Sequence, residues 1–218
     1  MILDIPKALL SPFSDDKWKS KLFILTLLSI LGTFLEPSGL GWLSWLPIFI
    51  FIGYCVQFSY NEIHNITPLL PDWHSNFLKY FKYGAIFSVI TFIYSIIVFL
   101  IMLTMIKLSY TLIFGIGGFI FSIVCLWITG AYCDNFQFKD AFNMKKFIRL
   151  ISKIQLEIII FILIIFALFT IACILAPFVK DLKLSKTTVV LIISLLEPFI
   201  ILFINNLIAQ IYRIGKDV

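Results

Sequence analysis

Long apolar runs recur along the whole chain, and they restrict its fold more than any other feature of the sequence. Of the 218 residues, 61% are hydrophobic and only 13% are charged, whereas roughly 25% of the residues in a soluble domain are charged. Several runs are long enough to cross about 30 Å of hydrocarbon as helices. The sequence therefore predicts an all-α integral membrane protein, a helical bundle that forms one domain over residues 1–218.

Six apolar segments are bounded by prolines, glycines or charged residues, as is typical where helices end. We expect membrane spans at about residues 18–35, 41–60, 85–106, 110–132, 156–178 and 187–212. Short connections arrange these six transmembrane helices as three hairpins. The first span has a short apolar centre, so a re-entrant hairpin is an alternative there.

An aromatic and basic segment precedes each hairpin. Residues 1–21 form an amphipathic lead, and residues 71–83 and 136–154 are predicted to lie on the inner leaflet as amphipathic segments. Anchoring is expected from side chains that place a ring or a cation at headgroup depth, namely Trp18, Trp73, Lys79, Lys82, Lys145, Lys146 and Arg149. The expected partners are therefore anionic lipid headgroups at the cytoplasmic face, and a partner subunit or a second copy of the chain is a further candidate.

The positions of the cations predict the orientation in the membrane. If the N-terminus lies inside, only four of the 17 lysines and arginines fall on outer turns: Lys107, Lys180, Lys183 and Lys186. This bias follows the positive-inside rule and predicts a multi-pass protein of the cell membrane with both termini in the cytoplasm. Because the cations cluster at the ends of apolar runs, the net charge of +5 indicates lipid headgroups, and no nucleic-acid partner is expected.

Glu197, which Pro198 follows, is the strongest candidate for a functional residue. It lies near the middle of the last expected span, where an ionised carboxylate costs a few kcal/mol. Such an acid indicates a proton, cation or ligand site, with Pro198 loosening the helix so that backbone carbonyls can take part. The alternative is a protonated Glu197 that hydrogen-bonds to a Ser, Thr or Tyr of a neighbouring helix and serves packing.

Further polar residues lie toward the cytoplasmic ends of the helices. Asn205, Asn206 and Gln210 extend the candidate ligand or ion site along the last span. A polar cytoplasmic mouth is predicted from four more residues, Gln57, Asn61, Asp134 and Asn135. The same side chains would equally serve as hydrogen bonds between helices and as end caps.

One segment holds an enzyme-like set of side chains: Glu62, His64, Asp72 and His74. Their spacing matches no common zinc or catalytic motif, and two prolines separate the pairs. We expect a capped turn there, with Asp72 capping the following helix, and we expect no metal, no cofactor and no catalytic residue. The cysteines show no CxxC spacing and are predicted to be buried thiols: Cys55, Cys125, Cys133 and Cys173.

Several short motifs resemble those of a known membrane-protein family. They are Gly53-Tyr54, Leu70-Pro71-Asp72-Trp73 followed by Gly84, Ala141-Phe142, and Gln210-Ile211-Tyr212-Arg213. In these residues the chain resembles domain of unknown function number 4013, an uncharacterised multi-pass membrane family of bacteria and archaea. It departs from the family at Gln57 and Tyr60, where members often carry arginine, and at Ala209, where the last motif usually has glycine. The resemblance implies architecture and brings no assigned activity.

The leading functional hypothesis is a small permease-like protein, or the membrane subunit of a larger system, that handles a small or lipidic ligand. The repeated hairpins and the polar cytoplasmic mouth motivate it. The alternative is a structural membrane protein that organises lipid or a partner, with its polar residues serving only packing. An intramembrane enzyme ranks third.

Overall fold

The chain folds into helices throughout the part that the structure describes. The computed structural model describes residues 3–35, 41–74, 76–104, 110–181 and 185–217, and no strand occurs within these ranges. The helices, in chain order, are α1 (Ile5–Leu10), η1 (Ser11–Phe13), α2 (Trp18–Leu35), α3 (Gly41–Ile63), α4 (Phe77–Thr104), α5 (Tyr110–Asn135), η3 (Phe138–Phe142), α6 (Met144–Lys153), α7 (Gln155–Asp181) and α8 (Lys186–Asp217).

Each of the six apolar segments expected to span the membrane is helical, with some boundaries moved. α3 continues to Ile63, and α4 begins at Phe77 instead of near Ala85. The expected outer turns at 36–39, at Lys107 and at Lys183 lie outside the described residues.

Four helices are long and apolar enough to cross a membrane: Trp18–Leu35, Gly41–Ile63, Phe77–Leu103 and Thr187–Lys216. A fifth is obtained if Met144–Lys153 and Gln155–Leu168, which meet at 86°, are counted as one bent span. α5 contributes the shorter apolar stretch Ile120–Asn135. The chain is thus a helical membrane protein. Within the described residues, length and composition do not confirm the six spans and the three hairpins expected from the sequence.

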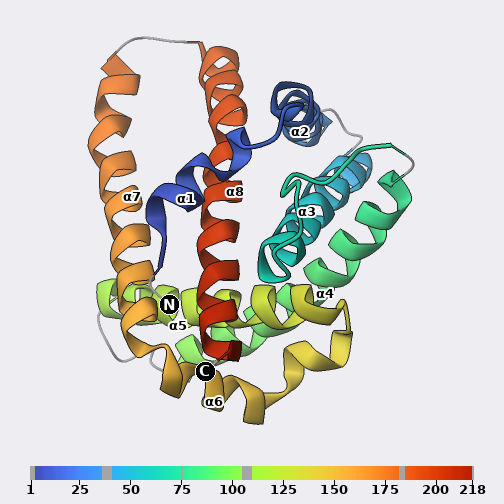
Figure 1. Ribbon diagram of the computed structural model, residues 1–218. Coiled ribbons are helices and arrows are strands. Elements are labelled where there is room, and N and C mark those ends of the chain that lie inside the picture. Colours follow the sequence, from blue (N-terminus) through green and yellow to red (C-terminus); the bar gives the residue numbers. More distant parts are fainter. Residues whose placement is uncertain (1–2, 36–40, 75, 105–109, 182–184, 218) are drawn as a thin grey trace.

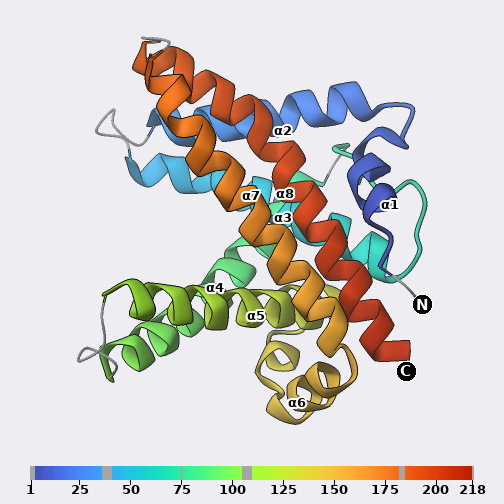
Figure 2. The ribbon, with the colours of Figure 1, turned by 90° about the vertical axis from the view of Figure 1, so that its left-hand side faces the viewer.

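In Figure 1, α7 and α8 stand upright above α6, and α2 is seen end-on at the top. Figure 2 shows the end of α2 with the start of α3, the end of α4 with the start of α5, and the end of α7 with the start of α8 all toward the left. Both chain termini lie on the opposite side in that view. α6 lies across the base of α7. The polar clusters described below belong to the end of the molecule that carries the termini.

α3 and α4 pack together through two glycines. A Cβ atom on Gly53 would overlap the carbonyl oxygen of Tyr80, and one on Gly84 would overlap the carbonyl oxygen of Phe49 and lie 2.8 Å from the Gly53 nitrogen. Close approach of backbones through small residues is a common way for helices to associate in lipid. The two glycines thus set the distance between α3 and α4.

Two buried clusters form the interior. One lies between α3, α5 and α8 and includes Trp127 and Tyr132, and the other lies between α2, α3 and the segment before α4 and includes Tyr54 and Trp73. The indole of Trp127 donates a hydrogen bond of 2.8 Å to the carbonyl of Ala141, which anchors η3 beneath α5. Aromatic side chains in the interior thus use their polar atoms to fix loop carbonyls.

The segment 71–83, expected to lie on the membrane surface with Trp73 as an anchor, is arranged differently. Residues from Phe77 onward form the first turns of α4. Trp73 is only 7% exposed, its ring stacks on Tyr54 at 4.3 Å, and its indole donates to the Lys21 carbonyl at 3.3 Å. Because the glycine contact draws the start of α4 against α3, Trp73 and Tyr80 lie in the interior instead of facing headgroups, while Phe77 is exposed.

Candidate functional site

Glu197 lies at a cavity between α2, α3 and α8. The cavity has a volume of about 350 Å³ and, besides the carboxylate, is lined by the hydroxyls of Ser29 and Thr33 and by apolar atoms of the three helices. The Ser29 hydroxyl donates a hydrogen bond to Glu197 Oε2. A shallower groove of about 280 Å³ along α8 is also lined by Glu197. Glu197 therefore lines two neighbouring hollows, the cavity and the groove.

The described side chains around Glu197 supply no compensating positive charge. Among the described residues, no lysine, arginine or histidine forms an ion pair with its carboxylate. Pro198 follows within the helix, so the carbonyl of Ser194 receives no N–H from that position. A carboxylate inside a span, hydrogen-bonded to one hydroxyl and without a cation, favours a proton or a bound donor as its partner.

A second cluster is centred on Glu62, at the end of α3, whose side chain is only 1% exposed. Its Oε1 atom lies 2.8 Å from Lys7 Nζ and 3.3 Å from Arg213 Nη1, and Asn206 donates to Oε2 at 3.4 Å. Gln210 donates to the Asn206 side chain at 2.7 Å. Two cations and one amide thus compensate a fully buried carboxylate.

Gln210 also fixes the N-terminal segment. Its Oε1 atom accepts from the Asp4 backbone N–H at 2.9 Å, and its Nε2 atom donates to the Asp4 carbonyl at 3.2 Å. The Asp4 side chain in turn accepts from the Lys7 backbone N–H at 2.8 Å and caps α1. Through this amide, the start of the chain is held against the end of α8.

A third cluster gathers the ends of α3, α5 and α8 around Asp134. Lys216 Nζ lies 2.7 Å from Asp134 Oδ1, and the His64 ring nitrogen Nε2 lies 3.3 Å from the same oxygen. The Tyr212 hydroxyl donates to Oδ2 at 3.5 Å. The Tyr212 ring covers Gly130 so closely that a Cβ atom there would overlap it. This cluster joins three helices at one point.

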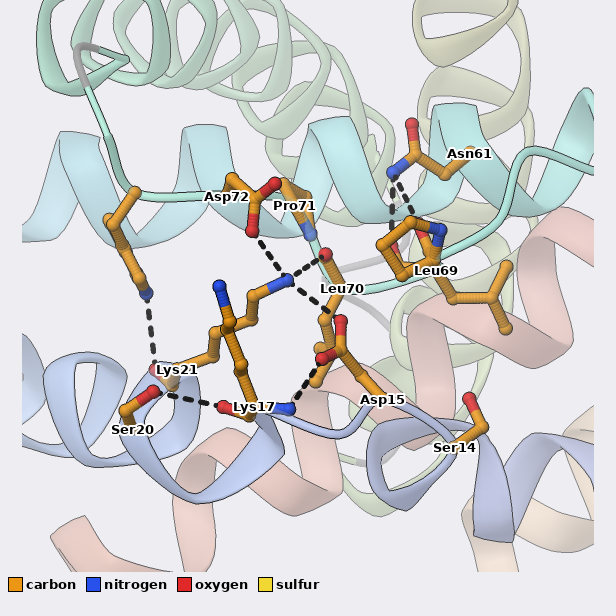
Figure 3. A network of polar contacts seen from close by, with 12 residues as sticks. Ser14, Asp15, Lys17, Ser20, Lys21, Asn61, Leu69, Leu70, Pro71 and Asp72 are labelled. Carbon is orange, nitrogen blue, oxygen red and sulfur yellow. Dashed lines mark hydrogen bonds and ion pairs between the residues drawn. The ribbon is translucent and has the colours of Figure 1, made fainter.

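The fourth cluster, drawn in Figure 3, surrounds the buried ammonium of Lys21. Lys21 Nζ lies 2.7 Å from Asp15 Oδ2, 2.8 Å from Asp72 Oδ1 and 2.8 Å from the Leu70 carbonyl oxygen. All three ammonium donors thus have acceptors. The hydrogen bond from Lys21 lowers the pKa of Asp72 below its ordinary value. Asp72 therefore ties the segment before α4 to the start of α2, in place of the expected helix cap.

The residues predicted for a cytoplasmic mouth are distributed among these contacts. Gln57 donates to the side chain of Asn61 at 3.0 Å, and Asn61 donates to the Leu69 carbonyl at 3.0 Å. Asn135 bonds to the neighbouring Asp134 at 3.5 Å. Gln57, Asn61 and Asp134 are buried. Their hydrogen bonds connect helices and loops, as in the packing alternative.

The candidate ligand residues of α8 separate into two groups. Asn206 and Gln210 belong to the Glu62 cluster. Asn205 accepts a hydrogen bond of 3.2 Å from Ser59 and donates to the Ile201 carbonyl at 2.8 Å. None of these three residues lines the cavity at Glu197.

The enzyme-like set of the sequence does not come together. Glu62 bonds to Lys7 and Arg213, His64 to Asp134, and Asp72 to Lys21. Within the described ranges, no group of three or more His, Cys, Asp or Glu side chains could hold a metal ion. Cys55 and Cys133 are buried thiols and Cys125 is half-buried, and the side chain of Cys173 lies outside the description.

The remaining predicted anchors lie at the surface or at its edge. The half-buried Trp18 ring packs edge-on against Phe13 at 5.0 Å, and the Lys79 ammonium lies 5.6 Å from the Tyr83 ring. The other predicted anchors are exposed on α4 and α6: Lys82, Lys145, Lys146 and Arg149. These positions are compatible with headgroup contact.

A protein-family model described as "Protein of unknown function (DUF4013)" matches residues 40–179, well over half of the chain. The chain belongs to this family. The matched range of this DUF4013 protein contains Gly53-Tyr54, the Leu70–Trp73 motif, Gly84 and Ala141-Phe142, whereas the motif at 210–213 lies beyond it. No curated protein and no solved structure matches the chain. Only a domain of unknown function is therefore found, and no enzymatic family is indicated.

The structure explains the motif residues by packing. The two glycines join α3 to α4, the Tyr54 hydroxyl donates to the Pro71 carbonyl at 3.0 Å, and the Ala141 carbonyl accepts from Tyr94 and Trp127. Sequence reasoning missed Ser29 as the partner of Glu197 and Lys21 as a buried ammonium. In the sequence, Ser29 is visible only as a serine inside an apolar run, and Lys21 only as one of several lysines near Trp18.

Proposed function

We propose that this DUF4013 protein holds a small, membrane-dissolved ligand in the cavity at Glu197, as a small permease or the membrane subunit of a larger system would. One observation carries the proposal: a carboxylate inside a span faces a cavity of about 350 Å³ that is otherwise mainly apolar. Intramembrane acids commonly mark substrate or ion sites.

The lining of the cavity indicates the chemistry of the ligand. Apolar side chains such as Ile48 and Phe51 would contact an apolar body, while Glu197 and Thr33 accept hydrogen bonds. An amphiphile with a protonated amine would supply the positive charge that the described side chains near Glu197 do not provide. Its ammonium would replace the Ser29 hydroxyl as the hydrogen-bond donor to the carboxylate.

The membrane arrangement is part of the same proposal. We infer six spans, α2, α3, α4, α5, α7 and α8, paired as three hairpins with both termini in the cytoplasm. The excess of cations at the end that carries the termini supports this orientation. The shared direction of the three helix pairs in Figure 2 supports the pairing.

A structural role is the second candidate, because the Ser29–Glu197 hydrogen bond ties α2 directly to α8. In that case the carboxyl serves packing, and the protein organises lipid or a partner. An amphiphile would then have no preferred place at Glu197.

The test is a thermal-stability measurement on the purified protein in detergent, with dodecylamine as the probe. Binding to the folded state alone stabilises it by about 2.7 kcal/mol when the free ligand is at about 100 times its Kd. We expect dodecylamine to raise the melting temperature of the wild-type protein, and dodecanol, which has the same chain without the charge, to raise it less. The Glu197→Gln variant should lose the difference between the two probes.

Glu157→Gln is the matched control, since Glu157 lies in the first turn of α7 and does not line the cavity. It should respond to both probes as the wild type does. Equal responses of the wild type to amine and alcohol, with a lowered melting temperature for Glu197→Gln, would support the structural role instead.

A further inference from the structure

α6 is a short basic helix that turns sharply into α7. Asn143 caps its start by accepting from the Lys146 backbone N–H at 3.2 Å. Its axis meets the first part of α7 at 86°. If α7 enters the membrane, a helix at nearly a right angle to it lies along the membrane surface.

α6 is held firmly on the core by one face. Leu150 and Ile154 are buried, and a Cβ atom on Gly215 of α8 would lie 2.5 Å from Leu150 and 2.9 Å from Ile154. The glycine thus lets the end of α8 sit directly under α6. This close contact fixes which sides of α6 face outward.

The outward sides of α6 differ in chemistry. Met144 and Ile148, one turn apart, are both exposed, Ile148 to 65%. The adjoining side carries exposed cations, which are Lys145, Lys146, Arg149 and Lys153. Of these four, Lys146 forms an ion pair with Asp140 at 3.8 Å. Around the axis of α6, the side packed on the core is followed by an exposed apolar side and then by a basic side. This arrangement suits the boundary between acyl chains and headgroups.

We infer that α6 is a binding platform for anionic lipid headgroups of the leaflet in which it lies. Ile148 and Met144 contact the acyl region, and Lys145, Arg149 and Lys153 contact lipid phosphates. The partner is indicated by the charge of the basic side and by the 86° turn, which lays α6 along the membrane surface within reach of the headgroups. The inference rests on the proposed crossing of the membrane by α7 and does not depend on the cavity at Glu197.

The test compares hydrogen–deuterium exchange of α6 in nanodiscs of phosphatidylcholine alone and in nanodiscs that also contain phosphatidylglycerol. Attraction of each basic side chain to an anionic surface slows local opening by up to about fivefold. We expect slower exchange of residues 144–153 in the anionic discs, and we expect high salt to remove the difference. The Lys145→Gln/Arg149→Gln variant should lose most of it, because both side chains are exposed and their replacement leaves the core side of α6 intact.

The Lys79→Gln/Lys82→Gln variant is the control, since it removes the same net charge from the exposed start of α4. It should keep the dependence of α6 on lipid composition. Equal exchange of wild-type α6 in both kinds of disc would overturn the inference. So would a lipid dependence that survives in the α6 variant, because the cations of α6 would then not be its cause.

Discussion

Lys21 shows how single residues connect distant parts of this protein. Its ammonium joins Asp15, before α2, to Asp72 and the Leu70 carbonyl, before α4. The Lys21 carbonyl in turn accepts from the Trp73 indole. One buried lysine therefore fixes the loop that follows α3 onto the start of α2, as Figure 3 shows for its carboxylate partners.

The Lys21–Asp72 pair should make stability depend on pH in the acid range. The hydrogen bond from Lys21 lowers the pKa of Asp72 from its ordinary value of 3.8. A group whose pKa is lowered in the folded state stabilises that state above its unfolded pKa, and the contribution is lost as pH falls through the folded pKa. At pH values below about 4 we expect the melting temperature of the wild-type protein to decrease. The decrease should be smaller in Asp72→Asn, whose melting temperature is already lower at neutral pH. Asp16→Asn, at an exposed neighbour, should retain the wild-type profile.

Glu62 should be more sensitive to substitution than its exposed partner. Glu62→Gln leaves the buried Arg213 without its carboxylate, and breaking a buried pair from one side costs about 3 kcal/mol or more. Lys7 has a side chain that is 41% exposed, so Lys7→Gln leaves the Arg213 contact and should cost about 1 kcal/mol or less. Chemical denaturation of both variants measures which substitution lowers the free energy of unfolding more. A larger loss for Lys7→Gln would contradict this account of the cluster.

At the scale of elements, the pairing of α3 with α4 depends on two glycines. Ala at Gly53 or Gly84 would force the backbones apart, because each Cβ atom would overlap a carbonyl oxygen of the facing helix. Overpacking of this kind costs about 1–3 kcal/mol, and more where only backbone can move. Gly118→Ala is the control, since a Cβ atom there meets nothing within 4 Å, and it should leave the melting temperature nearly unchanged. Similar melting temperatures for all three variants would show that the contact does not determine stability.

The sequence predicts which residues form helices better than it predicts which helices pack together. Apolar runs of helical length identify α2, α3, α4, α5, α7 and α8, and the amphipathic pattern identifies α6. The start of α4 was misplaced, because Phe77, Tyr80 and Tyr83 beside lysines have the composition of a surface segment. The burial of Tyr80 depends on the Gly53–Gly84 contact between two helices, which no local pattern contains.

Only part of the candidate site can be predicted from the sequence, because the rest depends on contacts between helices. Glu197 stood out because a carboxylate in an apolar run is costly wherever the helix packs. Its cavity and its hydrogen bond to Ser29 depend on how α2 crosses α8, and no periodic pattern in the sequence indicates that crossing. The sequence identifies the polar residues at the ends of α3 and α8, but their division between the clusters at Glu62 and Asp134 follows only from the tertiary fold.

At the scale of the whole molecule, the proposed topology places the termini on one side of the membrane and the α7–α8 turn on the other. Cysteines introduced at the exposed positions Asp16 and Ser185 test it in sealed, right-side-out vesicles. A membrane-impermeant maleimide should label Ser185→Cys and leave Asp16→Cys unlabelled until the vesicles are opened. The parent protein measures the background from the native cysteines. Labelling of both positions from the same side would exclude the six-span arrangement.

The proposed function requires the carboxyl group of Glu197 to be open to ligands dissolved in the membrane. The most direct measurement is the rate at which dicyclohexylcarbodiimide, an apolar reagent for carboxyl groups, modifies Glu197 in nanodiscs, read by mass spectrometry of the α8 peptide. We expect Glu197 to be modified, and we expect dodecylamine to slow the reaction more than dodecanol does. A carboxyl group that the reagent does not modify, or that both amphiphiles protect equally, would contradict the proposed function.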